Sequence, residues 1–425
     1  MRNVVAGVAL AMMIAVAAPV RAQAPFNAEH VTNEPGATLL LPYFAVQLPK
    51  KIGGKAPGIN TLFSINNASA SAALVHVTIW SDFSVPVFGF NVYLTGYDVQ
   101  PISMLDLVNG TLPVTGDAAD DPTDTISNKG SHSQDINFPG NMSAQPAQLD
   151  EATINHIRAA LTGKPSPLLS GQCLGRDYAE KKPIARGYVT VDSVVDHTAL
   201  EPNDINYFTN VIDTRNILWG DSFFINKSKK IGRADTLVAV RASTTDPQVN
   251  SIFEYSFYDT TNGSLVPVDK RQPLGSVFAG RFVNVPKHPF YPGGTSAIVW
   301  RDSKVAQAPF ICGQTPTWFP LSQRQLVAFD EQENPELLQL SPFPGATQIV
   351  KVGGPTFPVS AASGWLYMDL NAPTPSASGS PIEDPSAQQA FVTMVFDNVG
   401  KYSVGARAVV LDDAAEVDHS SLPLP

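Results

Sequence analysis

The sequence predicts an all-β protein of two sandwich-like modules, immunoglobulin-like or jelly-roll-like, with a small, partly helical insertion in the first. Apolar and polar residues alternate in many short runs, as half-buried strands require. The 36 prolines and 30 glycines interrupt these runs and leave room for few long helices. After an export signal, about 400 residues remain, which exceeds the size at which one hydrophobic core usually keeps growing.

The first 22 residues have the pattern of a secretory signal peptide. Arg2 supplies a positive charge, residues 4–18 are almost wholly apolar, and the segment ends in Val20-Arg21-Ala22. This arrangement is typical of a signal that is cleaved after a small residue. We therefore expect the mature chain to begin at Gln23 and to be secreted or periplasmic.

The strand pattern is clearest at residues 73–80. Val75, Val77 and Ile79 fall on one face and His76 on the other, which predicts a half-buried antiparallel strand. Similar runs predict strands at residues 38–46, 61–66, 87–97, 187–195, 222–225, 236–242, 252–258, 276–283, 295–300, 325–329, 348–352 and 364–369.

Two turns predict hairpins. Residues 261–264 contain an Asn-Gly pair, which tolerates the positive φ angles of a tight turn after the run at 252–258. Residues 391–396 lead into Asp-Asn-Val-Gly and return as residues 402–411, so that this pair closes the last sheet. We place the boundary between the modules near residues 270–273, giving modules 23–270 and 271–425.

A polar stretch at about residues 109–183 reads as an insertion into the first module. Within it, Ile154, Ile157 and Leu161 recur at helical spacing, which predicts a helix over about 147–162.

The chain has two cysteines, Cys173 and Cys312, in a compartment that permits disulfides. We expect a bridge between them. It would close a loop of about 140 residues and restrict the unfolded chain by roughly 4–5 kcal/mol in the loop-entropy model.

The charge balance argues against nucleic-acid binding. The formal net charge is −10 and the pI is near 5.1, whereas a phosphate backbone requires a basic footprint. After the signal no apolar run is long enough to predict a membrane span.

Two acidic clusters are candidates for acid–base chemistry. Asp192, Asp196 and His197 come after residues 187–191 of a predicted strand, and a carboxylate can orient an imidazole for proton transfer. Glu331, Glu333 and Glu336 follow the strand predicted at 325–329, where paired carboxylates could serve a glycosidase. A polar network and a solvated loop are the simpler interpretations.

A third cluster consists of Asp117, Asp120, Asp121 and Asp124. Calcium prefers several oxygen ligands on flexible loops, so this segment is a candidate calcium site. The glycine and terminal glutamate of an EF-hand are missing, and a plain acidic loop is the alternative. Calcium is the one cofactor that the sequence suggests.

Several segments resemble a group of uncharacterised secreted bacterial proteins. They are residues 39–44, 61–67, 91–100, 186–192, 218–221, 299–302 and 364–371. The resemblance implies bacterial export and a β-rich fold, and it implies no site residue.

The sequence contains no Gly-x-Ser-x-Gly, no His-Glu-x-x-His and no phosphate-binding glycine loop. We therefore expect a non-enzymatic structural, adhesive or ligand-binding protein of the bacterial envelope or exterior, whose partner is a surface polymer or another protein. The alternatives are a carbohydrate-active hydrolase that uses the acids near Glu331 and a calcium-dependent binding module.

Overall fold

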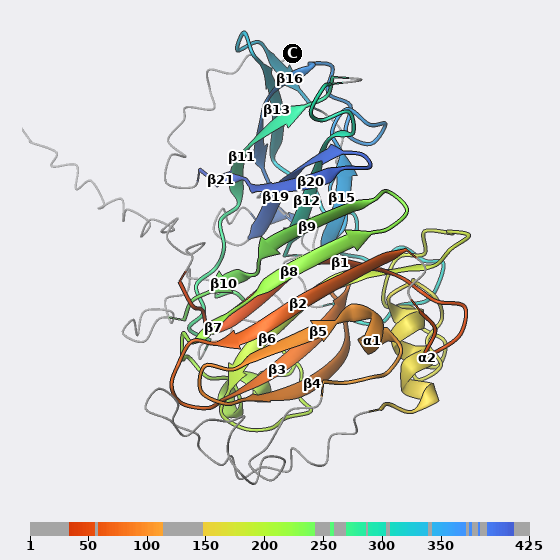
Figure 1. Cartoon of the computed structure of the whole chain (residues 1–425), viewed down its shortest axis with the longest axis vertical. Coiled ribbons are helices and arrows are strands. Elements are labelled where there is room, and N and C mark those ends of the chain that lie inside the picture. Colours follow the sequence, from red (N-terminus) through yellow and green to blue (C-terminus); the bar gives the residue numbers. More distant parts are fainter. Residues whose placement is uncertain are drawn as a thin grey trace, which may run out of the picture.

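The computed structural model describes most of the chain. The described residues are 34–55, 58–113, 148–242, 256–258, 269–285, 288–302, 307–338, 342–370 and 389–411, with the strand backbone at 374–375 and 381–382. The predicted export signal, the four calcium candidates Asp117, Asp120, Asp121 and Asp124, and the predicted Asn-Gly turn at 261–264 lie outside them. Within the described residues the protein is all-β and sandwich-like, with three short helices (Figure 1).

The first half of the chain forms two antiparallel sheets that pack face to face. One has the order β10-β1-β6-β3-β4, with strands β1 (Thr38–Gln47), β3 (Ala73–Ser81), β4 (Pro86–Leu94), β6 (Ile184–Val194) and β10 (Val238–Val240). The other has the order β5-β2-β8-β9, with β2 (Ile59–Asn67), β5 (Val99–Ser103), β8 (Asp221–Asn226) and β9 (Ile231–Thr236), and the short β7 (Leu218–Trp219) pairs with β2.

The core of this sandwich follows from the period of two. Val77 and Val191 of the first sheet face Phe63 and Ile65 of the second, and all four are buried. Alternate residues of a strand point to opposite faces, so the inward set fills the space between the sheets.

The second half forms a similar pair of sheets. One has the order β14-β13-β16-β11-β21, with β11 (Val277–Val283), β13 (Gln325–Asp330), β14 (Pro335–Leu337), β16 (Ser363–Asp369) and β21 (Val409–Val410). The other has the order β15-β12-β19-β20, with β12 (Gly294–Arg301), β15 (Thr347–Lys351), β19 (Ala390–Asn398) and β20 (Tyr402–Arg407). Phe278, Val299, Leu366 and Met394 belong to the core between them. The predicted β19–β20 hairpin is confirmed.

The helices are peripheral. They are α1 (Met104–Val108), α2 (Glu151–Ala160) and α3 (Ile205–Asn210). Separately, β17 (Thr374–Pro375) pairs with β18 (Pro381–Ile382) in a two-stranded sheet. Helix α2 confirms the helix expected in the insertion. It begins after Asp150, whose carboxylate accepts a hydrogen bond from the backbone N–H of Thr153 at 2.7 Å, and Ile157 packs into the core of the first sandwich.

The two sandwiches pack against each other. Every residue of β12 is buried, because Val299 faces the second core while Trp300 faces the first half of the chain. The edge strands β9 and β20 also run side by side (Figure 1), and Arg407 of β20 donates to the carbonyl oxygen of Thr236 at 2.9 Å. The sheets divide between β10 and β11, but Arg271, in the expected boundary segment, is fully buried. The domain limits themselves stay a prediction.

The prediction of a half-buried strand at residues 73–80 was wrong. All nine residues of β3 are buried, His76 included. The second face of this sheet is covered by an aromatic layer that contains Tyr207 and Trp300, which come from distant parts of the chain. Alternation identified the strand, but it could not show that both faces are covered.

Six strands were not predicted, namely β5, β7, β9, β14, β17 and β18. Residues 256–258, at the end of the expected run 252–258, are not strand. The strand expected at 236–242 is reduced to Val238–Val240.

Candidate functional site

The acidic loop after β13 lines an open cavity of about 400 Å³ at one end of the second sandwich. Asp330, Glu331 and Glu336 contribute to its wall, together with Asn334 and Ser360. Glu333 is not among the lining residues; it is exposed in the turn, with a φ angle of 65°. The structure thus places two of the three predicted glutamates, Glu331 and Glu336, at one cavity.

Each acid at this cavity has a local partner. Glu331 forms an ion pair with Arg281 at 2.9 Å, and Glu336 accepts hydrogen bonds from the backbone N–H and hydroxyl of Ser360 at 2.9 and 2.7 Å. Asp330 accepts hydrogen bonds from the side-chain amide and the backbone N–H of Asn334 and from the backbone N–H of Gln332, and these bonds hold its pKa below the ordinary value. These contacts are those of a well-ordered polar turn.

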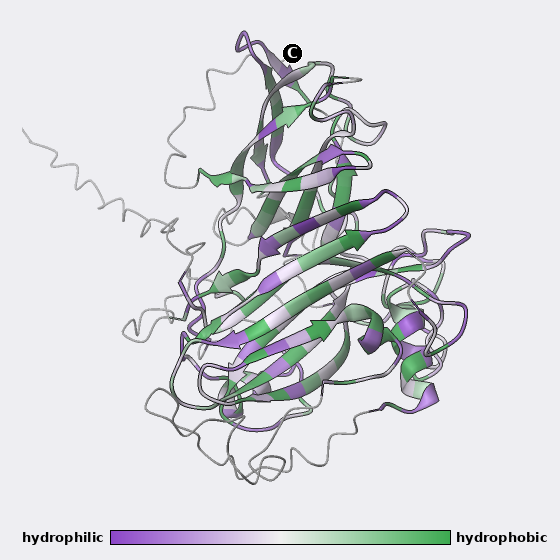
Figure 2. Ribbon diagram, viewed as in Figure 1, coloured by the Kyte–Doolittle hydropathy of each residue, from purple (hydrophilic) through white to green (hydrophobic). Residues whose placement is uncertain are grey.

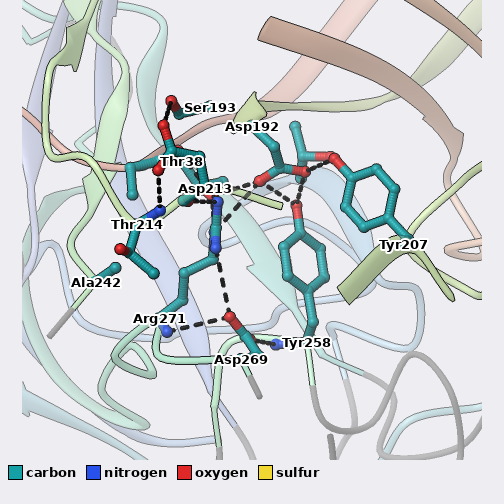
Figure 3. A network of polar contacts seen from close by, with 12 residues as sticks. Thr38, Asp192, Ser193, Tyr207, Asp213, Thr214, Ala242, Tyr258, Asp269 and Arg271 are labelled. Atoms are coloured by element: carbon teal, nitrogen blue, oxygen red, sulfur yellow. Dashed lines mark hydrogen bonds and ion pairs between the residues drawn. The ribbon is translucent and has the colours of Figure 1, made fainter. Parts of the chain in front are cut away.

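Asp192 lies in a buried network and not beside a substrate cleft (Figure 3). Its carboxylate accepts hydrogen bonds from the hydroxyl groups of Tyr207 and Tyr258, the latter at 2.9 Å, and from Thr38. The second predicted residue, His197, is half-buried after β6, and no hydrogen bond or ion pair within the described residues joins it to Asp192. The two candidates are therefore not brought together.

Arg271 is the cation of this network, and sequence analysis missed it. Its guanidinium lies 3.4 Å from Asp192 and 3.5 Å from Asp269, and it donates to the carbonyl oxygen of Asp213 at 2.9 Å. Burial alone would lower the pKa of Arg271, but the charges of Asp192 and Asp269 outweigh burial and hold that pKa above its ordinary value. The network ties the segment between the sandwiches to β1 and β6.

The disulfide between Cys173 and Cys312 is present. The backbones also pair there, because Cys173 and Phe310 exchange two hydrogen bonds at 2.8 and 2.9 Å. This contact fixes the loop between β12 and β13 to the predicted insertion in the first half, and Phe310 and Trp318 of that loop pack on the first core.

The outer face of the β5-β2-β8-β9 sheet is the second candidate surface, and no helix or strand of the described residues lies over it in Figure 1. Along β7 and β8 the outward residues are Trp219, Asp221, Phe223 and Ile225. Three of them are exposed apolar side chains: Trp219 is 44%, Phe223 47% and Ile225 38% exposed. Monomeric proteins rarely leave large apolar residues grouped in this way unless the surface binds something.

Neighbouring strands extend this surface. Phe223 lies opposite Leu62, Ser64 opposite Pro101, and the exposed Val99 opposite Asn66. Figure 2 shows apolar residues interspersed with polar ones along β2, β5 and β8. We call this surface the open face and define it by its outward residues, which are Asn60, Leu62, Ser64, Asn66, Val99, Pro101, Ser103, Trp219, Asp221, Phe223, Ile225, Gly232, Ala234 and Thr236.

Gly220 lies between β7 and β8, where the chain passes close to β2. A side chain there would meet the carbonyl oxygen of Ser64 at 2.1 Å, so only glycine lets β7 and β8 stay in one register beside β2. Trp219 of β7 and Phe223 of β8 consequently lie in one row along the same edge of β2 and point to the same face. Sequence analysis missed this surface because Phe223 and Phe224 look alike in sequence, while only Phe224 packs inward.

Comparison of the chain with models of protein families, with characterised proteins and with solved structures gave no match. None of the helices in the described residues is long and apolar enough to span a membrane. No group of three or more His, Cys, Asp or Glu side chains in the described part of the chain is arranged to hold a metal ion.

Proposed function

We propose that this is an exported, non-enzymatic binding protein of the bacterial envelope or exterior, which recognises a surface polymer or protein through the open face. The observation that carries the proposal is the row of exposed Trp219, Phe223 and Ile225 on an otherwise well-packed sandwich. Recognition needs a rigid scaffold that presents side chains in fixed positions, and the open face lies on strands, not on loops.

The join between the sandwiches supports a static role. The buried ions around Arg271, the aromatic layer that contains Trp300 and the Cys173–Cys312 bridge all cross between the halves. Moving the halves apart would separate the buried ion pairs and unpack the aromatic rings, at a high cost in free energy.

The test is a direct contest between binding and turnover. Purified mature protein is incubated with a panel of polysaccharides, and both bound protein and released reducing ends are measured. The proposal predicts saturable binding without turnover. Release of reducing ends by the wild-type protein would contradict it.

A carbohydrate-active hydrolase is the second candidate, because Glu331 and Glu336 line one cavity. A glycosidase requires two carboxylates that flank the scissile bond. The Glu331→Gln and Glu336→Gln variants decide this alternative, since turnover that disappears in either variant would assign catalysis to the cavity. Calcium binding at 117–124 stays a prediction, to be tested by the effect of calcium on the melting temperature.

A further inference from the structure

We infer that the open face takes an extended, uncharged polysaccharide, with its sugar rings stacked on Trp219 and Phe223. This inference rests on the proposed function and adds the chemical class of the ligand. It follows from the composition of the face, from the spacing of its aromatic residues and from its charge.

The composition suits a ligand that is apolar on its flat sides and polar at its edges. Along β2 the apolar Leu62 lies between the polar Asn60 and Ser64, and the rings of Trp219 and Phe223 lie on the neighbouring strands. The hydroxyl oxygen of Ser64 accepts a hydrogen bond from the backbone N–H of Asp221 at 3.1 Å, and its own hydrogen remains available to a ligand. A sugar ring offers C–H groups on its faces and hydroxyl groups on its rim, so stacking and hydrogen bonding are satisfied together.

The same composition argues against a second copy of this chain as the occupant. In a dry interface between two such faces, the carboxylates of two Asp221 side chains would lose water, and no outward residue of the face is a cation that could pair with them. Sugar hydroxyl groups can donate hydrogen bonds to this carboxylate.

The spacing indicates an oligomeric ligand. Trp219 and Phe223 are four residues apart on one strand line, which corresponds to roughly 13 Å at ~3.3 Å per residue. Two ring-stacking positions this far apart exceed one sugar ring.

The charge of the face indicates a neutral ligand. Asp221 is its one charged residue, although the whole chain carries a formal net charge of −10. An anionic polymer would meet this carboxylate, and no outward residue of the face is a cation. Arg233 of β9 lies over the ring of Phe224, on the inner side of the sheet, and Arg407 of β20 lies at the edge of the face beside Thr236. Lys227 and Lys229 lie in the turn beyond the end of β8.

The experiment measures retention of the full mature chain on neutral and on anionic polymers. Cellulose, chitin and xylan are the neutral probes, and alginate and pectate are the anionic ones. The variants are Trp219→Ala and Phe223→Ala. The matched control is Phe290→Ala, which removes a ring that is 64% exposed in the second sandwich. Circular dichroism melts establish that each variant is folded.

We expect at least one neutral polymer to bind the wild-type protein and the Phe290→Ala variant equally. Each open-face substitution should weaken this binding by about tenfold, as loss of a central aromatic anchor does.

Binding that is unchanged in both open-face variants, or binding to anionic polymers alone, would overturn the inference and leave the proposed function standing. A wild-type dimer that becomes monomeric in the Phe223→Ala variant would also overturn it, in favour of self-association. Turnover of a polymer would instead contradict the proposed function itself.

Discussion

Two aromatic surfaces of this protein differ in what covers them. Between the sandwiches, the ring of Trp300 is 5.9 Å from Tyr188 and 5.5 Å from Phe257, centroid to centroid, and Trp300 is 4% exposed. On the open face, Trp219 is 44% exposed. The first surface is covered by the other half of the chain, whereas the second is presented to solvent.

The difference also extends to charge. The interface encloses two carboxylates and Arg271, while the open face carries Asp221 alone. Charged groups that are buried and paired fix one arrangement of the halves, since each must keep its partner. Residue type alone therefore does not identify a functional site; the covering of the surface does.

Arg271→Met should give the largest loss of stability. The substitution leaves Asp192 and Asp269 buried without their cation, and breaking a buried pair in this way costs about 3–5 kcal/mol. The free energy of unfolding in urea measures the effect. The matched control is Arg281→Met, which removes an exposed pair with Glu331 and should cost less than about 1 kcal/mol. Equal losses of unfolding free energy in the two variants would show that the buried network stabilises the protein no more than an exposed ion pair does.

Substitution of one tryptophan at each surface compares them directly. Trp300→Ala leaves a void between the sandwiches and should cost about 3–5 kcal/mol. Trp219→Ala removes a ring that faces solvent and should change stability by less than about 0.5 kcal/mol. Thermal or urea unfolding of both variants provides the measurement, and a large loss in Trp219→Ala would mean that its role is structural.

Loss of the disulfide should give the next largest effect. A Cys173→Ser/Cys312→Ser double variant frees the unfolded chain and should lower the free energy of unfolding by about 2–5 kcal/mol. Reduction of the wild-type protein should give the same shift. If reduced and oxidised protein unfold at one urea concentration, the bridge does not hold the halves together.

Substitution of Glu201 should give a smaller effect than loss of the disulfide, and one that depends on pH. Burial raises the pKa of Glu201 from 4.5 to about 7. The folded state therefore binds the proton more tightly than the unfolded state, so this carboxyl makes the protein less stable as pH rises from about 4.5 to about 7. Glu201→Gln should raise stability at pH 8 by on the order of 2 kcal/mol and leave it unchanged at pH 4.

The control for this prediction is Glu331→Gln, the same substitution at an exposed carboxylate, measured at the same pH values. A Glu201→Gln variant whose stability follows the wild-type curve at every pH would contradict the assignment.

Most of the strands could be predicted because alternation is a local signal. The disulfide followed from two cysteines and an export signal. Arg271 could not be predicted as the partner of Asp192, because their contact depends on how β6 meets a segment from the other half of the chain. The exposure of Phe223 could not be predicted either, since the sequence shows that a residue is apolar but not whether another layer of the structure covers it.

Oxidation of Trp219 by N-bromosuccinimide, followed by peptide mass mapping, tests the central claim most directly. The account predicts rapid oxidation of Trp219 in the free protein, slow oxidation of Trp80 and Trp300, which are 1% and 4% exposed, and protection of Trp219 when a neutral polysaccharide is bound. Oxidation of Trp219 at the same rate in free and polymer-bound protein would contradict it.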